Sequence, residues 1–317
     1  MRAIVYERYG PPEVLELREV DAPVVGERDV LVRVRAASVG AGDWHMLTAT
    51  WFAVRLYQGL LRPKRPILGY DVSGTVEAVG AAVTRFRPGD QVFGASDEGG
   101  AFAELMRVPE SGLVRRPPGL SHAQAAAVPT SALTALQGLR DKGRIRAGQQ
   151  VLVNGASGGV GTFAVQLARV FGAEVTATAS TAKLDLVRSL GAAHAIDYTR
   201  EDFTRGERRY DLVLDNVGNR PLADCKRTLT PTGIYVAVSG APTRSLRVAL
   251  TGGRRMVALL SKPNQPDLAF LAELLESGEL TPVIDRTYPL REVPDALHRL
   301  GAGQARGKLV ITVGDAG

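Results

Sequence analysis

Hydrophobic residues alternate with polar ones, or cluster in short runs, over roughly the first 120 positions, and glycine, proline and aspartate separate the runs. Segments with this pattern are 1–7, 29–39, 71–80 and 90–94. A period of two is typical of half-buried strands. We find no helix-length periodic pattern between them. The pattern therefore predicts a compact, mainly antiparallel β domain in this part of the chain.

The character of the chain changes near residue 121. Segment 121–139 has helix composition, with Ser121 as a candidate N-cap. Apolar runs then alternate with helical patterns. We predict strands at 149–155, 173–180, 194–198, 210–218 and 233–240, and helices at 159–172, 181–191 and 223–229. Strands that alternate with helices predict a parallel sheet with right-handed crossovers, and near-continuous apolar strands indicate a sheet covered on both faces.

Beyond this block, the pattern predicts helices at 267–280 and 292–303 and a strand at 307–313. The last strand has β character after the alternating region has ended, so we expect the chain to return to its first domain. The expected organisation is a β domain of residues 1–121 and 290–317, and an α/β domain of residues 122–289.

The composition of the chain excludes several kinds of site and partner. The 317 residues carry a net charge of +6 and a single cysteine, Cys225. One cysteine excludes an intrachain disulfide and any zinc site built from several thiolates. The basic residues are scattered without aromatic interleaving, so we expect no nucleic-acid partner. No apolar run has the length of a membrane span and the N-terminus has no apolar signal core, so we expect a cytoplasmic protein without membrane association.

The sharpest motif is VLVNGASGGVGTFAVQLAR at 151–169, where a strand enters a glycine-rich turn and an amphipathic helix comes next. Gly155 permits the tight turn, Gly158 and Gly159 let a pyrophosphate approach the backbone, and Gly161 lets the helix pack on the sheet. Free N–H groups at the helix start favour phosphate. The alternative is a glycine-rich turn without a ligand. The dinucleotide-binding residues expected here are Gly155, Ser157, Gly158, Gly159, Val160 and Gly161.

The end of the second strand of this domain indicates which dinucleotide is bound. A cofactor with a free ribose 2′-hydroxyl usually meets a carboxylate there, and the residues 178–180 offer none. Ser180 and Thr181 offer hydroxyl groups and Lys183 a positive charge, which suits a 2′-phosphate. The alternative is a helix cap followed by a solvated lysine. The sequence favours NADPH over NADH.

Long motifs resemble one known family along nearly the whole chain. They are PILGYDVSGTVEAVG (66–80), RFRPGDQVFG (85–94), GGAFAEL (99–105), AAAVPTSALTAL (125–136), the GASGGVG turn, GAAHAIDYTREDF (191–203), LDNVG (214–218), KPN (262–264) and ARGKLVITV (305–313). The chain resembles a medium-chain dehydrogenase/reductase of the zinc-independent quinone oxidoreductase (zeta-crystallin-like) branch. That resemblance implies an α/β protein with a GroES-like β domain and an inserted Rossmann domain, a doubly wound parallel sheet.

The resemblance also bears on zinc. Zinc-dependent relatives place a cysteine just after the strand near position 40 and a Gly-His-Glu where this chain has Gly69, Tyr70 and Asp71. Thiolate and imidazole are both missing, and His45 with Asp43 falls short of the three protein ligands that catalytic zinc normally needs. We expect no functional metal site. Reduction of an electrophilic acceptor does not depend on a Lewis acid as alcohol oxidation does.

Candidate catalytic residues are Tyr70, His45 and Asp43. Tyr70 stands where the family has its zinc-binding histidine and could donate a hydrogen bond to an enolate or quinone oxygen, or could be a packing residue. His45 could donate a proton or simply pack beside Trp44. Asp43 matches a family aspartate and could receive backbone hydrogen bonds in the turn. Family members often carry asparagine where this chain has Gly40.

The resemblance implies further cofactor contacts at the start of the linking helix, near the adenosine phosphate, at strand ends and in the KPN and GKLV motifs. These residues are Thr130, Thr134, Tyr198, Asn216, Val217, Ser239, Gly240, Asn264 and Lys308. Asn216 is also a candidate donor to the acceptor oxygen. Segment 47–63, with Trp51 and Tyr57, is either an apolar wall for the substrate or ordinary domain packing.

The function that these features favour is an NADPH-dependent, zinc-free reductase that transfers hydride to quinones or α,β-unsaturated carbonyls, with the nucleotide in the cleft between the domains. Relatives commonly form a homodimer through a Rossmann edge strand, so we look to 233–240 and 241–261 for an unpaired edge. One alternative is a zinc-type alcohol dehydrogenase with unusual ligands. The other is an NADPH-binding sensor or structural protein with little turnover.

Overall fold

The computed structural model describes residues 1–238 and 242–314, and Ser239 and Gly240 lie outside the described residues. The chain forms two compact units. Unit 1 consists of residues 1–130, 262–278 and 282–317, and unit 2 of residues 131–261 and 279–281.

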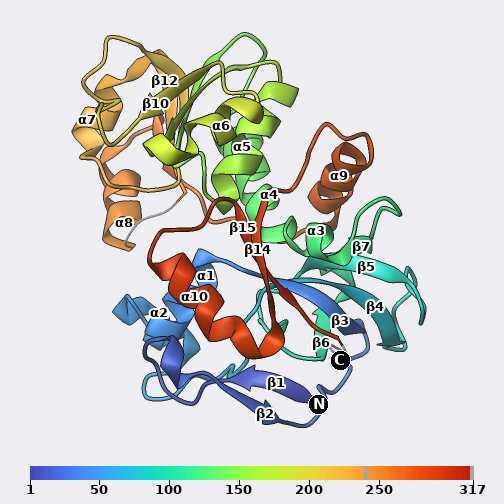
Figure 1. Ribbon diagram of the computed structural model, residues 1–317. Coiled ribbons are helices and arrows are strands. Elements are labelled where there is room, and N and C mark those ends of the chain that lie inside the picture. The colour runs from blue at the N-terminus through green and yellow to red at the C-terminus, as the bar shows by residue number, and fades with distance from the viewer. Residues whose placement is uncertain (239–241, 315–317) are drawn as a thin grey trace. The chain divides into compact units, whose positions relative to one another are not determined.

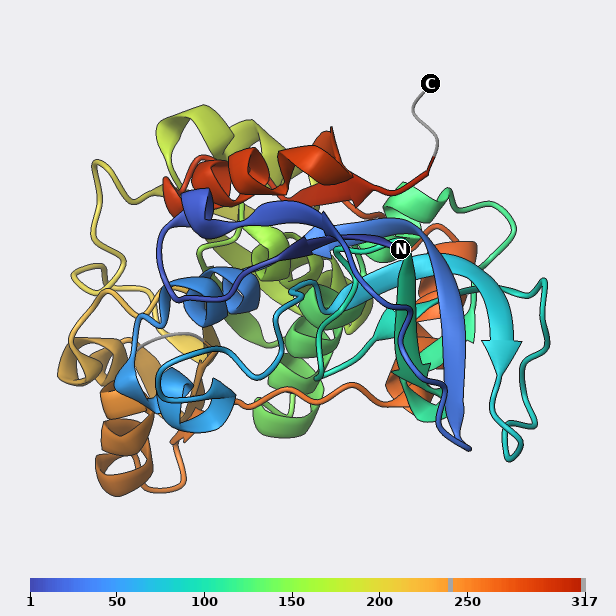
Figure 2. The ribbon, with the colours of Figure 1, turned by 90° about the horizontal axis from the view of Figure 1, so that it is seen from below.

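Strands from both ends of the sequence form one sheet in unit 1. β15 (Lys308–Thr312) pairs antiparallel with β3 (Asp29–Val39), and Leu309 lies opposite Val39, so the C-terminal strand lies in the same sheet as a strand from the first part of the chain. Both views show the red C-terminal segment beside blue β3 (Figures 1 and 2). Within the described residues the strand order is β14 (Ile284–Pro289), β15 (Lys308–Thr312), β3 (Asp29–Val39), β4 (Asp71–Val79), β5 (Gln91–Ala95) and β7 (Leu113–Arg115), with β6 (Leu105–Pro109) also paired to β3.

The period of two predicted for this sheet is visible in β3. Val32, Val34 and Ala36 are buried, while Arg33 and Arg35 between them are exposed. Val32 and Val34 pack with apolar residues of β4, β5 and β15 in the core of unit 1, whereas Ala36 belongs to a separate small cluster with Ala126, Ala127 and Val310. A separate antiparallel pair, β1 (Arg2–Val5) with β2 (Glu16–Glu19), completes the β structure near the N-terminus.

Two short helices lie where we predicted none. They are α1 (Ala41–Thr48) and α2 (Phe52–Gln58). The prediction was wrong because neither helix has a clear apolar stripe: only Asp43 and Leu47 are buried in α1, and only Val54 and Gln58 in α2. Each helix is also shorter than the 11 to 18 residues over which a period of 3.6 can be recognised.

Parallel strands form the sheet of unit 2. Across the part that the structure describes, the order is β10 (His194–Asp197), β9 (Glu174–Ala179), β8 (Gln150–Asn154), β11 (Tyr210–Asp215), β12 (Leu229–Ala237) and β13 (Met256–Ala258). This is the doubly wound order 3-2-1-4-5-6, and its direction reverses between β8 and β11. The fold class expected from the sequence is confirmed.

Helices connect these strands and pack against them. They are α5 (Gly159–Val170) on β8 and β9, α6 (Leu184–Ser189) on β9 and β10, α7 (Leu222–Arg227) on β12 and α8 (Pro242–Thr251) on β13. The strand predicted at 233–240 is therefore an interior strand rather than an edge, because β12 pairs with β11 on one side and β13 on the other. The edge strand on this side is β13, within 241–261.

The division between the units differs from the sequence boundary. Ser121 caps α3 (His122–Ala126) in a capping box with Gln124, as its sequence predicts, but α3 packs on β3 and β4 and so belongs to unit 1. The chain enters unit 2 within α4 (Pro129–Leu136), which a π-helical segment (Gln137–Lys142) continues.

Helix α9 (Gln265–Glu276) also belongs to unit 1, where it packs on β7, and α10 (Val293–Gly301) packs on α1. In the described part of the chain, no helix combines the length and the apolar character that crossing a membrane requires.

Candidate functional site

The glycine turn lies at the carboxyl end of β8, where the strand order of unit 2 reverses. Gly155 has φ of +76°, a conformation that favours glycine. A Cβ atom on Gly161 would lie 2.2 Å from the Gly155 carbonyl oxygen, so no side chain fits there. A Cβ atom on Gly158 would lie 3.6 Å from the same oxygen, an ordinary contact. The predicted tight turn and close helix packing are both present.

Helix α5 begins directly after this turn. Its N-cap is Gly158, which has no side chain to cap the helix. The N–H groups of the first helical turn have no carbonyl partner within a helix, and with the helix dipole they favour an anion. The residues 155–161 therefore fit the pyrophosphate of a dinucleotide, which bare main-chain amides can bind.

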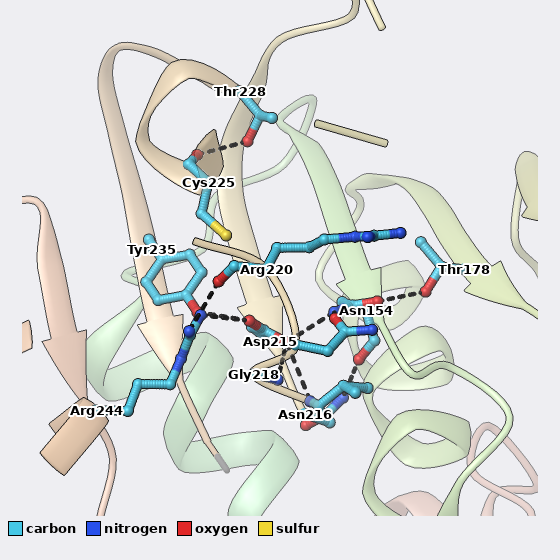
Figure 3. A network of polar contacts seen from close by, with 12 residues as sticks. Asn154, Thr178, Asp215, Asn216, Gly218, Arg220, Cys225, Thr228, Tyr235 and Arg244 are labelled. Carbon is cyan, nitrogen blue, oxygen red and sulfur yellow. Dashed lines mark hydrogen bonds and ion pairs between the residues drawn. The ribbon is translucent and has the colours of Figure 1, made fainter. Parts of the chain in front are cut away.

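Asp215, at the end of β11, is fully buried and organises the neighbouring strand end (Figure 3). Its Oδ1 atom accepts hydrogen bonds from Asn154 Nδ2 at 2.8 Å and from the amides of Val217 at 3.0 Å and Gly218 at 2.9 Å. Asn154 Oδ1 in turn accepts from the Thr178 hydroxyl at 2.7 Å. One hydrogen-bonded chain thus joins the ends of β9, β8 and β11.

This chain of contacts reaches the glycine turn itself. The Gly155 amide donates to Thr178 Oγ1 at 3.0 Å, and Ala156 N donates to the Thr178 carbonyl oxygen at 3.0 Å. A Cβ atom on Gly155 would lie 2.6 Å from Val217 Cγ2, so the loops after β8 and β11 approach closely. The glycine turn 155–161 and the loop 216–218 therefore form one local structure.

Asn216 presents an acceptor without a partner. Its side-chain Nδ2 donates to the Asn154 carbonyl oxygen at 3.1 Å, which fixes the amide, because a carbonyl oxygen can only accept. The Asn216 Oδ1 atom is buried and has no hydrogen-bond partner among the described residues. A buried acceptor of this kind normally has a partner. A donor group of a bound ribose or carboxamide would satisfy it.

Of the residues expected to bind the 2′-phosphate at the end of β9, Thr181 already has a partner within the protein. The Thr181 hydroxyl donates to Asp197 Oδ2 at 2.5 Å, and this hydrogen bond lowers the pKa of Asp197. Tyr198 follows Asp197, is half exposed, and its amide donates to the Ala179 carbonyl oxygen at 3.1 Å. Ser180 and Tyr198 are thus brought together at the ends of β9 and β10.

In unit 1, Asp43 is buried and joins two turns. Its carboxylate accepts hydrogen bonds from the Gly40 and Gly69 amides, both at 2.8 Å. Burial raises the pKa of Asp43 to about 7, against the lowering effect of these two hydrogen bonds. Asp43 therefore receives the backbone hydrogen bonds that its sequence position suggests, and it holds the backbone just before Tyr70.

Tyr70 packs beside the start of α1, where its ring lies 3.7 Å from the position of a Cβ atom on Gly42. Burial, reinforced by the nearby Asp43 carboxylate, raises the pKa of the Tyr70 phenol, so the hydroxyl stays protonated at neutral pH. The structure records no hydrogen bond for this hydroxyl among the described residues. It is a donor that a substrate oxygen could use.

His45 packs against Trp51, with ring centroids 4.2 Å apart, and its Nδ1 lies 3.3 Å from Thr50 Oγ1. The packing partner is Trp51 rather than the adjacent Trp44. Burial lowers the pKa of His45, so the ring is neutral at pH 7. Tyr57 lies on α2, and its hydroxyl accepts a hydrogen bond from Arg65 at 2.7 Å.

Thr130 and Lys308 meet at one buried carboxylate in unit 1. Asp71 Oδ1 accepts from Thr130 N at 2.9 Å and from its hydroxyl at 2.5 Å, while Lys308 Nζ lies 3.3 Å from Asp71 Oδ2. Ser38 donates to the same oxygen at 2.7 Å. Lys308 is 3% exposed, so its ammonium group serves this ion pair.

The remaining predicted residues differ in their surroundings. Asn264 caps α9 and accepts from the Asp267 amide at 2.9 Å. Thr134 and Ser157 are buried, and Val217 is 44% exposed. Within 1–238 and 242–314, no group of three or more His, Cys, Asp or Glu side chains is placed to hold a metal ion.

Sequence reasoning missed Asn154, Thr178, Asp197 and Asp215. A local signal existed for Asp215, because a carboxylate that ends an apolar strand must find buried donors. For Asn154 and Thr178 the signal was weaker: each is a small polar residue at the end of an apolar run. Their partners are 61 and 24 positions away, so no local pattern pairs them.

Comparisons with known proteins agree with this architecture. Residues 26–118 match the family model of the alcohol dehydrogenase GroES-like domain, and residues 190–311 match the model of a zinc-binding dehydrogenase. The chain is 34% identical to a chloroplastic quinone-oxidoreductase homolog of Spinacia oleracea, over 98% of each chain. It is 36% identical to a chloroplastic NADPH-dependent alkenal/one oxidoreductase of Arabidopsis thaliana, over 98% of this chain and 79% of that protein.

A solved structure matches the whole chain as well. The quinone oxidoreductase from Coxiella burnetii superposes with a TM-score of 0.91 at 34% identity, covering 99% of each chain. Both the family models and these relatives confirm the resemblance drawn from the motifs. The chain belongs to the medium-chain dehydrogenase/reductase superfamily, in its quinone oxidoreductase-like branch, and is an oxidoreductase.

Proposed function

We propose that the protein is an NADPH-dependent reductase that transfers hydride to quinones or α,β-unsaturated carbonyls without zinc. The observation that carries the proposal is the strand-end site of unit 2, where the uncapped start of α5 and the unpartnered Asn216 Oδ1 atom lie at the reversal of strand order. Ligands of doubly wound sheets bind at this point. The names of the Spinacia and Arabidopsis relatives support the substrate class.

The residues after β9 support the preference for NADPH. No acid stands at the strand end, and the nearby Asp197 carboxylate already accepts from Thr181 and from the Thr199 hydroxyl at 2.6 Å. Thr181 is therefore committed to Asp197. We propose that Ser180 and Lys183, with Tyr198 beside them, bind the 2′-phosphate.

The dihydronicotinamide, when bound, supplies the hydride. Negative charge then develops on the acceptor oxygen and needs a hydrogen-bond donor. We propose Tyr70 for this role, since its raised phenol pKa keeps the proton in place and its hydroxyl has no recorded partner among the described residues. Asp43 would hold the Gly69 backbone and so position Tyr70, and the proton that completes the reaction would come from solvent or a nearby hydroxyl.

We propose a reaction without zinc because the side chains near Asp43 and Tyr70 lack suitable zinc ligands. Zinc-dependent relatives carry a cysteine just after the strand near position 40 and a histidine at the position of Tyr70, and segment 38–46 of this chain offers no thiolate. His45 is committed to packing on Trp51. The residues present therefore do not fit the three-ligand arrangement of a catalytic zinc site.

The experiment is a stopped-flow assay of NADPH oxidation against para-quinones and conjugated enones, with a saturated ketone as the matched control. We expect oxidation with the conjugated acceptors, unchanged after dialysis against a chelator. Alcohol oxidation that chelation abolishes and zinc restores would instead show a zinc-type dehydrogenase. Tight NADPH binding without turnover of any acceptor would show a sensor.

We also propose a cytoplasmic homodimer, with β13 as the pairing edge, because the other side of β13 has no strand partner among the described residues. Sedimentation of the wild type and of Ala258→Pro, which removes a backbone amide on the side of β13 that faces away from β12, tests the dimer. Fractionation of cells that express a tagged full-length chain tests the location, which the chloroplastic names of two relatives make worth measuring.

A further inference from the structure

The two oxygens of the Asp215 carboxylate face different parts of unit 2 (Figure 3). Oδ1 binds Asn154 and the amides of the loop after β11. Oδ2 faces away from that loop, toward β12 and α8. The buried Asp215 carboxylate therefore connects the candidate dinucleotide site with residues of β12 and α8 that lie outside this site.

Tyr235 and Arg244 supply the contacts on the Oδ2 side. The Tyr235 hydroxyl donates to Asp215 Oδ2 at 2.5 Å, and Arg244 Nη2 lies 3.2 Å from the same oxygen. Arg244 Nη2 also donates to the Tyr235 hydroxyl at 2.6 Å, and its Nη1 donates to the Arg220 carbonyl oxygen at 2.8 Å. The Arg244 side chain is 14% exposed, so the three groups form a compact, largely dry cluster.

Both sides of this carboxylate are needed to fix its orientation. A buried ionised carboxylate is costly unless its oxygens are paired, and a charged partner contributes more than a neutral one. Without Arg244 and Tyr235, the Oδ2 atom would lose its recorded donors. The carboxylate would then rotate toward other donors, and its three hydrogen bonds through Oδ1 would weaken.

The Oδ1 bonds set the shape of the site. They hold Asn154, whose carbonyl oxygen fixes the Asn216 amide, and they hold the turn at Val217, which packs against the Gly155 position. We propose that Arg244 and Tyr235 are positioning residues for dinucleotide binding, acting through Asp215 on the Asn216 acceptor and the glycine turn. This inference rests on the proposed function, since it assumes that a dinucleotide binds there.

The test is a fluorescence titration of full-length variants with NADPH, combined with steady-state kinetics. We expect Arg244→Met to raise the dissociation constant of NADPH about tenfold, the effect of losing one charged hydrogen bond. Tyr235→Phe, which removes a single hydroxyl and keeps the ring, should raise it severalfold. The KM for NADPH should rise in parallel, while kcat at saturating NADPH changes little. Arg244→Lys, which keeps the positive charge but lacks the two-pronged guanidinium group, should bind NADPH more tightly than Arg244→Met and less tightly than the wild type.

Arg255→Met is the matched control. Arg255 binds the carbonyl oxygens of Gly233 and Thr230 near the start of β12, and makes no recorded contact with Asp215. We expect this variant to melt at a lower temperature and to bind NADPH like the wild type. Should Arg244→Met fail to fold, Tyr235→Phe decides alone.

Wild-type affinity in both Arg244→Met and Tyr235→Phe would overturn the inference, as would an equal loss of affinity in Arg255→Met. In either case the wild type still binds NADPH, so the proposed function stands. A wild type that binds no nicotinamide dinucleotide would contradict the proposed function, and this inference with it.

Discussion

The Gly69 amide donates a 2.8 Å hydrogen bond to the buried Asp43 carboxylate, directly before Tyr70 in the chain. Burial dominates the electrostatics of this group and raises the pKa of Asp43 to about 7. A carboxyl whose pKa is higher in the folded state stabilises the fold most when protonated, and that stability is lost as pH rises through the folded pKa.

We therefore predict that the wild type loses stability relative to Asp43→Asn as pH rises from about 4 to about 8. The relative loss is at most about 4 kcal/mol, at about 1.4 kcal/mol per pKa unit. Urea unfolding of both proteins at several pH values measures it. Taking the difference removes the contributions of other titrating groups. A difference that does not change with pH would contradict the raised pKa of Asp43.

Alanine substitutions at Gly158 and Gly161 should have different effects, the first on NADPH binding and the second on the stability of the fold. A methyl group fits at Gly158, where the nearest atom to a Cβ would lie 3.6 Å away, but at Gly161 it would lie 2.2 Å from the Gly155 carbonyl oxygen. Gly161→Ala should destabilise the fold by about 1–3 kcal/mol through overpacking. Gly158→Ala should keep the melting temperature of the wild type and weaken NADPH binding at least about tenfold, because the methyl group blocks the phosphate. Unchanged affinity in Gly158→Ala would argue against a pyrophosphate at this turn.

Lys183 should decide between the two coenzymes. Lys183→Ala is expected to weaken NADPH about tenfold or more, as loss of a charged contact with the 2′-phosphate does, and to leave NADH unaffected. Lys142→Ala, a basic residue in the π-helical segment of the same unit, is the charge-matched control. Paired titrations with NADPH and NADH measure the ratio. Equal weakening of both coenzymes would mean that Lys183 does not recognise the 2′-phosphate.

Apolar side chains on α2 remain exposed, with Phe52 at 66% and Leu56 at 67%, close in sequence to Trp51 and Tyr57. If this segment is the wall of the substrate site, Trp51→Ala and Tyr57→Ala should raise the KM for hydrophobic quinones severalfold, with smaller effects on small enones. Val24→Ala, an exposed apolar residue elsewhere in unit 1, should change neither. Kinetics like those of the wild type at both positions would show that the segment does not line the substrate site.

The sequence predicts most strands of this fold because their signals are local. Val32, Val34 and Ala36 alternate with arginines in β3. The spacing of the glycines after β8 predicts the turn between this strand and α5. The helices α1 and α2 escape prediction because they are short and have few buried residues. The contacts of Asp215 could not be predicted from the sequence, because its partners Asn154 and Arg244 lie 61 and 29 positions away in the chain.

The central claim is that the glycine turn between β8 and α5 binds a nicotinamide dinucleotide, and fluorescence titration of the wild-type protein with NADPH and NADH tests it most directly. We predict saturable binding of NADPH at a single site per chain, with NADH binding more weakly. No saturable signal with either coenzyme would contradict the claim.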